Sequence, residues 1–130
     1  MQLDVSTSER VDVVDVTESV RDAVPSAVDR GVCTVFVPHT TAGVVVNEAE
    51  PRLLGDVERA LEKLVPRRGD YDHDDVDDNA DAHLRATLLG ESASIPVRDG
   101  DLALGTWQSV LFVECDGPRS RRLDVTVTTP

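Results

Sequence analysis

Cysteines, aromatic residues and long apolar runs are all scarce in this sequence. Cys33 and Cys115 are the only two cysteines, and each lies in an apolar, strand-like run. We interpret both as buried thiols rather than as disulfide partners or ligands. No apolar run approaches the roughly 18 residues of a membrane-spanning helix, and the amino terminus lacks the basic and then apolar segments of a signal peptide. We therefore expect a cytoplasmic protein with no membrane partner.

Positive charge is also scarce. The formal net charge is −12, and Lys63 is the only lysine among thirteen basic residues. Such acidity argues against a nucleic acid as partner. Dense carboxylates keep a protein soluble where salt screens their repulsion, although they destabilise the compact state at low ionic strength. The composition therefore predicts a halophilic protein, adapted to a cytoplasm of high salt concentration.

The length of 130 residues and the hydrophobic content of 40% predict one domain, residues 1–130, with a core of its own. Valine-rich segments at Arg10–Val16 and Val32–Val37 predict strands. Between them, Thr17 is the expected N-cap of a helix that Pro25 breaks, either by a kink or by an early end. The segment Gly43–Asn47 predicts a further strand.

Two more helices are expected in the middle of the chain. The first begins near Pro51, ends at Pro66 and carries an apolar stripe that we expect to pack on a sheet. After a polar loop, Arg67–Asp78, the second begins with Asp78 or Asn79 as its N-cap and ends at Gly90.

The last third of the chain predicts antiparallel β structure. Asp99-Gly100 is a strong hairpin-turn signal, and the expected strands are Ser94–Val97, Leu102–Leu104, Ser109–Glu114 and Leu123–Thr128. With the helices gathered in the middle, this order favours an α+β fold: an antiparallel β-sandwich with about three helices packed on it.

All three histidines, His39, His73 and His83, lie in or beside predicted loops. Each alone has an ordinary interpretation as a surface or core residue. Together they could hold a divalent metal and leave one coordination position open. Asn79 stands four residues before His83 on the same helix face and could orient the imidazole or a ligand. The aspartates around His73 lack the glycine and glutamate of an EF-hand loop.

A second cluster follows the strand that ends in Glu114. Arg119, Arg121 and Arg122 come directly after the turn Asp116-Gly117-Pro118. Guanidinium groups match phosphate oxygens, so this cluster predicts a phosphate-bearing ligand. Ion pairs within the protein are an equally good interpretation. Trp107, the only tryptophan, is expected in the core or at an interface.

The segments PHTTAGVVVNE, DNADAHL and LALGTWQSVLFVECDGPRSRR resemble the YjbQ family, also called UPF0047 or the secondary thiamine-phosphate synthase family. The resemblance covers nearly the whole chain in the same order. It implies an α+β fold built on an antiparallel sandwich, a homotrimer, and a metal bound by His39, His73 and His83.

The resemblance also implies an activity, the joining of a pyrimidine diphosphate to a thiazole phosphate. The expected metal is zinc, with magnesium or another divalent ion as alternatives, and the expected ligand is a small phosphorylated metabolite. Glu114 and Asn79 are candidate catalytic residues. Candidate substrate-binding residues are Thr40, Trp107, Gln108, Arg119, Arg121 and Arg122. Two alternatives stay open: a metal-dependent hydrolase of a small metabolite, and a non-catalytic trimeric protein that binds a metal or ligand.

Overall fold

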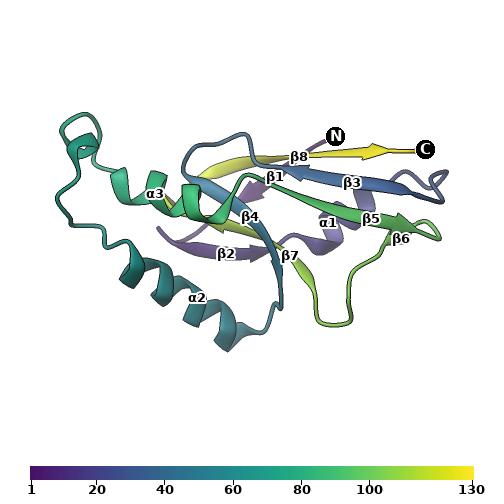
Figure 1. Cartoon of the computed structure of the whole chain (residues 1–130), viewed down its shortest axis with the longest axis horizontal. Coiled ribbons are helices and arrows are strands. Elements are labelled where there is room, and N and C mark those ends of the chain that lie inside the picture. Colours follow the sequence, from purple (N-terminus) through teal and green to yellow (C-terminus); the bar gives the residue numbers. More distant parts are fainter.

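The computed structural model describes all 130 residues as two antiparallel sheets curled over each other, with helices packed against them (Figure 1). The five-stranded sheet has the order β1-β8-β3-β5-β6, and the three-stranded sheet has the order β2-β7-β4. The strands are β1 Gln2–Ser6, β2 Asp12–Asp15, β3 Gly31–Phe36, β4 Ala42–Asn47, β5 Ser92–Arg98, β6 Asp101–Leu102, β7 Ser109–Glu114 and β8 Ser120–Thr128. The α+β sandwich expected from the sequence is confirmed.

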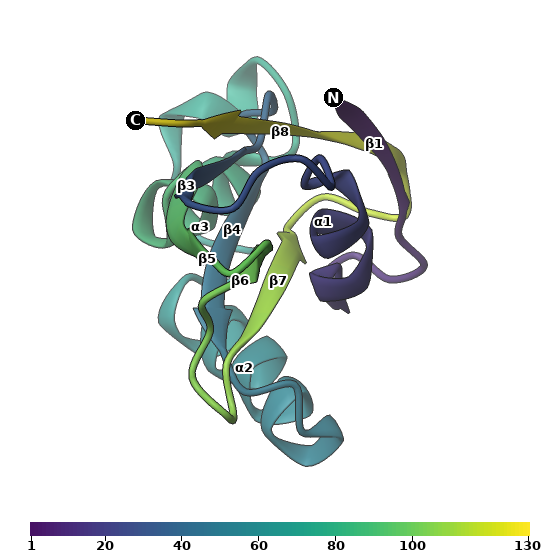
Figure 2. The ribbon, with the colours of Figure 1, turned by 90° about the vertical axis from the view of Figure 1, so that its right-hand side faces the viewer.

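The main core lies between the two sheets. Strand β3 shows the alternation that produces it, because Cys33 and Val35 are buried while Val32 and Phe36 face outward. The inward residues of β3, β5 and β8 meet Val44 of β4 and Phe112 of β7 in one cluster of 17 buried residues. Figure 2 shows β8 and β1 curling over β7, with α1 (Thr17–Ala23) on the flank of the sandwich.

The helices follow the sequence pattern with two differences. Helix α1 ends early, at Ala23, as Pro25 predicted: Val24 already has ψ 120°, because the residue before a proline avoids the helical region. Thr17 is not its N-cap, since Val16 occupies that position without a side-chain cap. A one-turn 3-10 helix, η1 (Asp72–Asp75), lies in the loop expected to be irregular.

Helices α2 (Pro51–Leu64) and α3 (Ala80–Leu89) lie where the sequence predicts them. Leu61 of α2 is buried in a second cluster with residues of β2 and β7, whereas Leu64, at the end of the expected apolar stripe, is 72% exposed. Helix α3 packs so closely on β4 that no side chain fits at Gly43, where a Cβ would lie 2.8 Å from Leu89 Cβ.

The strands differ from prediction mainly at their ends. Strand β1, which pairs with β8 along its whole length, was not predicted from the sequence. Strand β6 is Asp101–Leu102 rather than Leu102–Leu104, and β8 begins three residues earlier than expected, at Ser120. Asp99 and Gly100 both have positive φ, 51° and 78°, as in the tight hairpin turn that they predicted. None of the helices combines the length and apolar character that a membrane crossing requires.

Candidate functional site

Two of the three histidines meet at the start of α3. The ring centroids of His73 and His83 are 4.8 Å apart, with an angle of 78° between the ring planes. His73 lies in η1, and the backbone N–H groups of Val76 and Asp77 both donate to its carbonyl oxygen. Asp74 Oδ1 then accepts a hydrogen bond from the Ala80 N–H, at 3.1 Å. These bonds fold the loop back onto the first turn of α3, one turn before His83.

The two imidazoles line a pocket of about 350 Å³. Asp70, Tyr71 and Asp72 form one side of it, and Ala80 and Leu84 of α3 form the other. The Tyr71 hydroxyl donates to the carbonyl oxygen of Pro66 at 2.7 Å, and this bond fixes one wall. The pocket therefore combines two imidazole rings with two carboxylates.

His39 has different surroundings. Its Nε2 accepts a hydrogen bond from the backbone N–H of Arg122 at 2.9 Å. Burial, together with the positive charge of Arg121, lowers the pKa of His39 below its ordinary value. A ring that accepts at Nε2 is neutral, with its proton on Nδ1. Within one chain, no three histidine, cysteine or acidic side chains lie close enough together to hold a metal ion, so the three histidines do not converge as the sequence led us to expect.

Glu114 lies at the centre of a buried ion-pair network beside the His39 loop. Its side chain is fully buried and accepts from the Thr7 hydroxyl at 2.8 Å and from Arg121 Nε at 2.9 Å. The N–H groups of Cys115 and Asp116 donate to its second oxygen, Oε2. Burial favours the neutral acid, but the hydrogen bonds from Arg121 and Thr7 outweigh it and lower the pKa of Glu114.

Asp116 and Asp81 extend the network to the start of α3. Arg10 binds both carboxylates, at 3.0 Å and 2.8 Å, and Asp81 also pairs with Arg85 at 2.8 Å. Asn79 Nδ2 donates to Asp116 at 3.1 Å, whereas Asn79 Oδ1 is buried without a partner. Burial would raise the pKa of Asp116, but hydrogen bonds from Asn79 and Arg119 lower it.

The three arginines predicted to bind phosphate do not form one cluster. Arg121 points inward and donates to Glu114 and Thr41, whereas its neighbour Arg122 is exposed, because successive side chains of a strand face opposite sides. Arg119 is 51% exposed in its side chain and pairs with Asp116. Arg121 is therefore used within the protein, and only Arg119 and Arg122 are accessible to a ligand.

The other predicted substrate-binding residues lie outside the histidine pocket. Trp107 is 74% exposed in the β6–β7 loop, so the expected core position is wrong. Gln108 closes this loop through two hydrogen bonds with Gly105, one donated by its backbone N–H and one accepted by its side chain. Thr40 is exposed beside His39. None of these three residues lines the pocket of His73 and His83.

Several polar residues that build the network were not predicted as site residues from the sequence: Thr7, Arg10, Thr41, Asp81 and Arg85. Asp81 and Arg85 stand four residues apart on a helix, a spacing that permits an ion pair. Their burial, 1% exposure for each, gives no sequence signal because both residue types are usually exposed. The cysteines are free and buried as predicted, and burial raises the pKa of the Cys115 thiol to about 12.

Comparison with known proteins places these features in a family. The family model described as "UPF0047 protein YjbQ-like" matches residues 1–130. A UPF0047 protein of Archaeoglobus fulgidus is 51% identical over 125 residues, which cover 96% of this chain and 98% of that protein. YugU of Bacillus subtilis is 34% identical, with 92% and 91% of the two chains covered.

Solved structures agree with the fold. The hypothetical protein APE1520 of Aeropyrum pernix superposes with a TM-score of 0.97 at 44% identity, covering 100% of this chain and 98% of that one. A YbjQ-like protein of Sulfolobus solfataricus gives 0.94 at 40% identity, with 98% and 94% covered. Sequence and structure thus agree over the full chain, which belongs to the YjbQ (UPF0047) family.

Proposed function

We propose that this protein binds a divalent metal ion through His73 and His83 and acts on a small phosphorylated metabolite. The observation that carries the proposal is the pairing of the two imidazoles at the pocket between η1 and α3. They stand ten positions apart in the sequence, and the folding of the loop onto α3 brings them together.

The spacing of the rings fits a shared metal ion. Two imidazoles bound to one tetrahedral zinc ion, with Zn–N bonds of about 2.0 Å, have ring centroids roughly 5 Å apart. The observed separation is 4.8 Å. Imidazole favours zinc over magnesium, which prefers oxygen ligands. Asp70 and Asp72, which line the same pocket, add a negative potential that attracts any divalent cation.

The activity that we propose is of the thiamine-phosphate synthase type, in which a thiazole nitrogen displaces pyrophosphate from a pyrimidine diphosphate. A metal at His73 and His83 would supply positive charge to the departing pyrophosphate. This reaction needs electrostatic stabilisation rather than a protein nucleophile. That requirement matches a chain in which Cys115 is buried with a raised pKa and both oxygens of Glu114 are occupied.

Other residues would serve this reaction in supporting roles. Arg119 and Arg122 are the accessible members of the predicted arginine cluster and would bind phosphate oxygens. Asn79 has an unpaired Oδ1 at the start of α3, where it would orient a ligand. Glu114 would hold Arg121 and the adjacent turn in place rather than transfer a proton.

Metal binding is tested by replacing one ligand. Wild-type protein is expected to retain zinc through gel filtration, as measured by elemental analysis, and His83→Ala to bind zinc at least about tenfold more weakly, since even loss of a residue that orients a ligand costs that much. Thr87→Ala, one turn further along α3 and exposed, is the matched control. Equal zinc content in wild type and His83→Ala would contradict the site.

His39→Ala separates two versions of the site. If His39 of a neighbouring subunit completes the coordination, this variant will lose zinc as His83→Ala does. If solvent or substrate completes it, zinc will be retained. Either result leaves the His73–His83 pair as the metal site.

Activity is tested with the two halves of thiamine phosphate, the product being separated by chromatography. The zinc-loaded wild type should form it, and His83→Ala should not. Wild-type turnover equal to that of the variant would exclude this activity.

Two protein ligands also leave coordination positions open, as metal-dependent hydrolases require. A panel of esters, lactones and phosphoesters tests that alternative. If no compound reacts, but chelation lowers the melting temperature, the metal has a structural role.

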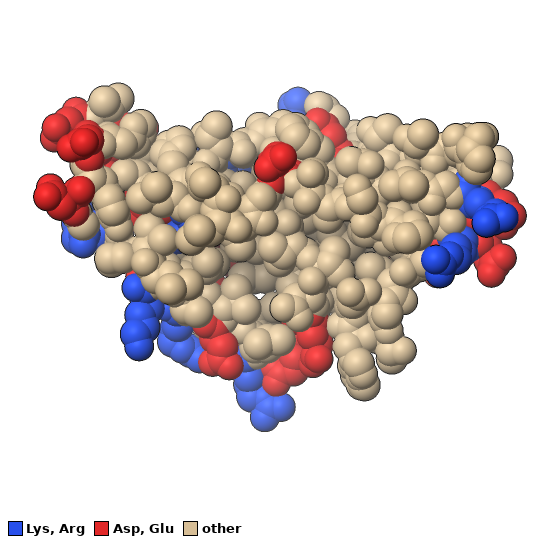
Figure 3. Space-filling view, viewed as in Figure 1, with Lys and Arg blue, Asp and Glu red and all other residues tan.

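We also propose that the protein forms a homotrimer. Phe36 of β3 and Leu88 of α3 are exposed by 42% and 67%, in a protein with 29% charged residues. Figure 3 shows that the face over α3, β4 and β5 carries few charged side chains: apart from an acidic group in its upper middle, they gather at its margins. Such a face is typical of a surface that another protein covers.

A further inference from the structure

A groove lies at the end of the molecule opposite the histidine pair. The start of β3 and the ends of β5 and β8 meet there, and Figure 1 shows this region at the far right, whereas the loop containing η1 lies at the far left. The groove has a volume of about 590 Å³ and is open to solvent along the outer side of the five-stranded sheet.

Two arginines without partners line this groove. Nine of the twelve arginines form ion pairs, and Arg122 donates to Gln2. Arg30 and Arg98 form no ion pair or side-chain hydrogen bond. Free guanidinium groups are unexpected in a chain with 25 acidic residues, and both of them are in this groove. Asp29 and Asp99 are adjacent in sequence, but neither forms an ion pair with them.

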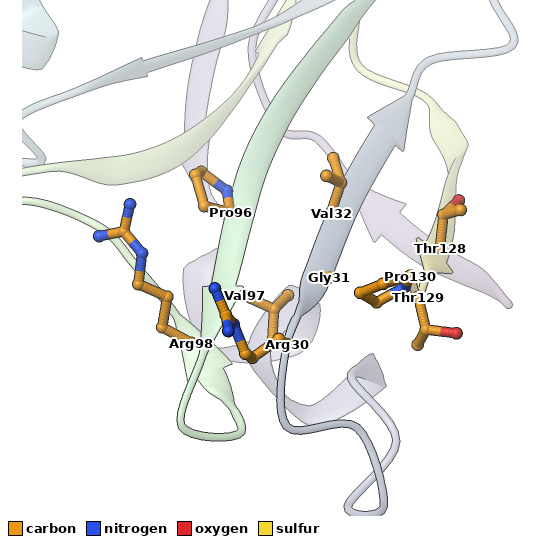
Figure 4. Close-up of a pocket in the computed structure, with 9 residues that line it drawn as sticks. All are labelled: Arg30, Gly31, Val32, Pro96, Val97, Arg98, Thr128, Thr129 and Pro130. Atoms are coloured by element: carbon orange, nitrogen blue, oxygen red, sulfur yellow. The ribbon is translucent and has the colours of Figure 1, made fainter.

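The sheet register brings the two charges together. Gly31 pairs with Val97 at the end of the β3–β5 ladder, so Arg30 and Arg98 lie one step beyond, on facing strand ends. Figure 4 shows their side chains extending in the same direction. Like charges opposite each other on neighbouring strands repel, and an anion between them would remove this repulsion.

Glycine is required at position 31, beside the groove, because β3 passes close to the end of β8 there. A Cβ at this position would lie 2.4 Å from the carbonyl oxygen of Thr128, so no other residue fits without a backbone shift. The remaining walls combine the hydroxyl-bearing Thr128 and Thr129 with the apolar rings of Pro96 and Pro130. The groove thus offers a ligand two guanidinium groups, hydroxyl groups and apolar contacts.

We infer that this groove binds a small organic anion with a phosphate or carboxylate group. Arg30 and Arg98 bind the oxyanion, since guanidinium groups match the oxygens of both groups. Pro96 and Val32 contact the apolar part of the ligand. The site shares no residue with the histidine pocket, so it is independent of the proposed metal chemistry.

The experiment uses phenyl phosphate, benzoate and inorganic phosphate as probes, with binding measured at low ionic strength by NMR shifts of backbone amides. Phenyl phosphate or benzoate is expected to shift the signals of Gly31, Val97 and Thr128, and the stronger of the two identifies the preferred oxyanion. Inorganic phosphate should bind more weakly than phenyl phosphate because it lacks the ring.

Charge-removing variants supply the decisive comparison. Arg98→Gln and Arg30→Gln should each weaken binding about tenfold or more, whereas Arg68→Gln, which removes the same charge from an exposed residue paired with Asp78, should change it little. Equal weakening in all three variants would overturn the proposal, as would shifts elsewhere in the protein. A change in particle mass in Arg98→Gln without loss of probe binding would instead assign these arginines to a protein interface. His83→Ala should bind the probes normally.

Discussion

Glu114 is the residue whose environment departs most from sequence expectation. A glutamate that follows an apolar strand was a candidate catalytic group, but the residues of β7 from Val110 to Glu114 are all buried, because the strand is central in its sheet and covered on both faces. Its carboxylate is ionised and fully occupied by hydrogen bonds. Burial of this kind cannot be read from residue type, since it depends on Thr7 and Arg121, which are distant in the sequence.

The pKa of Glu114 predicts how stability changes with pH. In the folded state the pKa lies below the ordinary 4.5, so in the interval between the two values the unfolded chain binds more protons and stability rises with pH. The contribution is complete above about pH 4.5 and is lost as the pH falls through the folded-state pKa. Asp116, whose pKa is also lowered, acts in the same direction.

Glu114→Gln is therefore expected to cost about 3–5 kcal/mol at pH 7, because Arg121 is left buried and unpaired, and to flatten the loss of stability on acidification. Urea unfolding at several pH values between 3 and 7 measures both effects. The double variant Glu114→Gln/Arg121→Met should recover part of the stability. A single variant as stable as the wild type would show that the pair does not stabilise the fold.

At the level of elements, the sequence predicted most of the helices and strands, and the differences lie mainly at the ends of strands. The apolar stripe of α2, the loop before Asn79 and the Asp99-Gly100 turn all act locally, so their patterns were sufficient. Strand β1 was missed because its sequence, QLDVS, has only Val5 buried and is defined by pairing with β8. Similarly, the pairing of His73 with His83 depends on η1, whereas His39 is held by the distant Arg122.

Replacement by alanine is expected to change the stability of the protein in opposite directions at Gly90 and Gly55. Gly90, after α3, has φ 89° and ψ 160°, a region that side-chain-bearing residues avoid, so Gly90→Ala should destabilise by about 1–3 kcal/mol. Gly55 lies within α2, where a Cβ would meet only the flexible Arg59 side chain at 3.4 Å, and Gly55→Ala should stabilise by up to about 1 kcal/mol. Thermal unfolding measures both, and shifts of the same sign would contradict this backbone argument.

At the scale of the whole molecule, charge is distributed very unevenly. The net charge is −12, yet the face over α3, β4 and β5 carries few charged side chains (Figure 3). We expect light scattering to give three times the chain mass of 14.1 kDa, and Leu88→Asp to reduce it. Leu64→Asp, which alters an exposed leucine at the end of α2, is the control. A wild-type mass equal to one chain would exclude the trimer.

The guanidinium of Arg85 has a consequence for the loop that carries His73. It donates to the carbonyl oxygens of Leu61 and Val65, so a side chain of α3 closes the carboxyl end of α2. The two helices are thereby joined at the base of the loop, independently of the residues between them. Insertions or deletions within residues 67–78 should therefore move His73 and reshape the mouth of the pocket, while the helix that supplies His83 keeps its place.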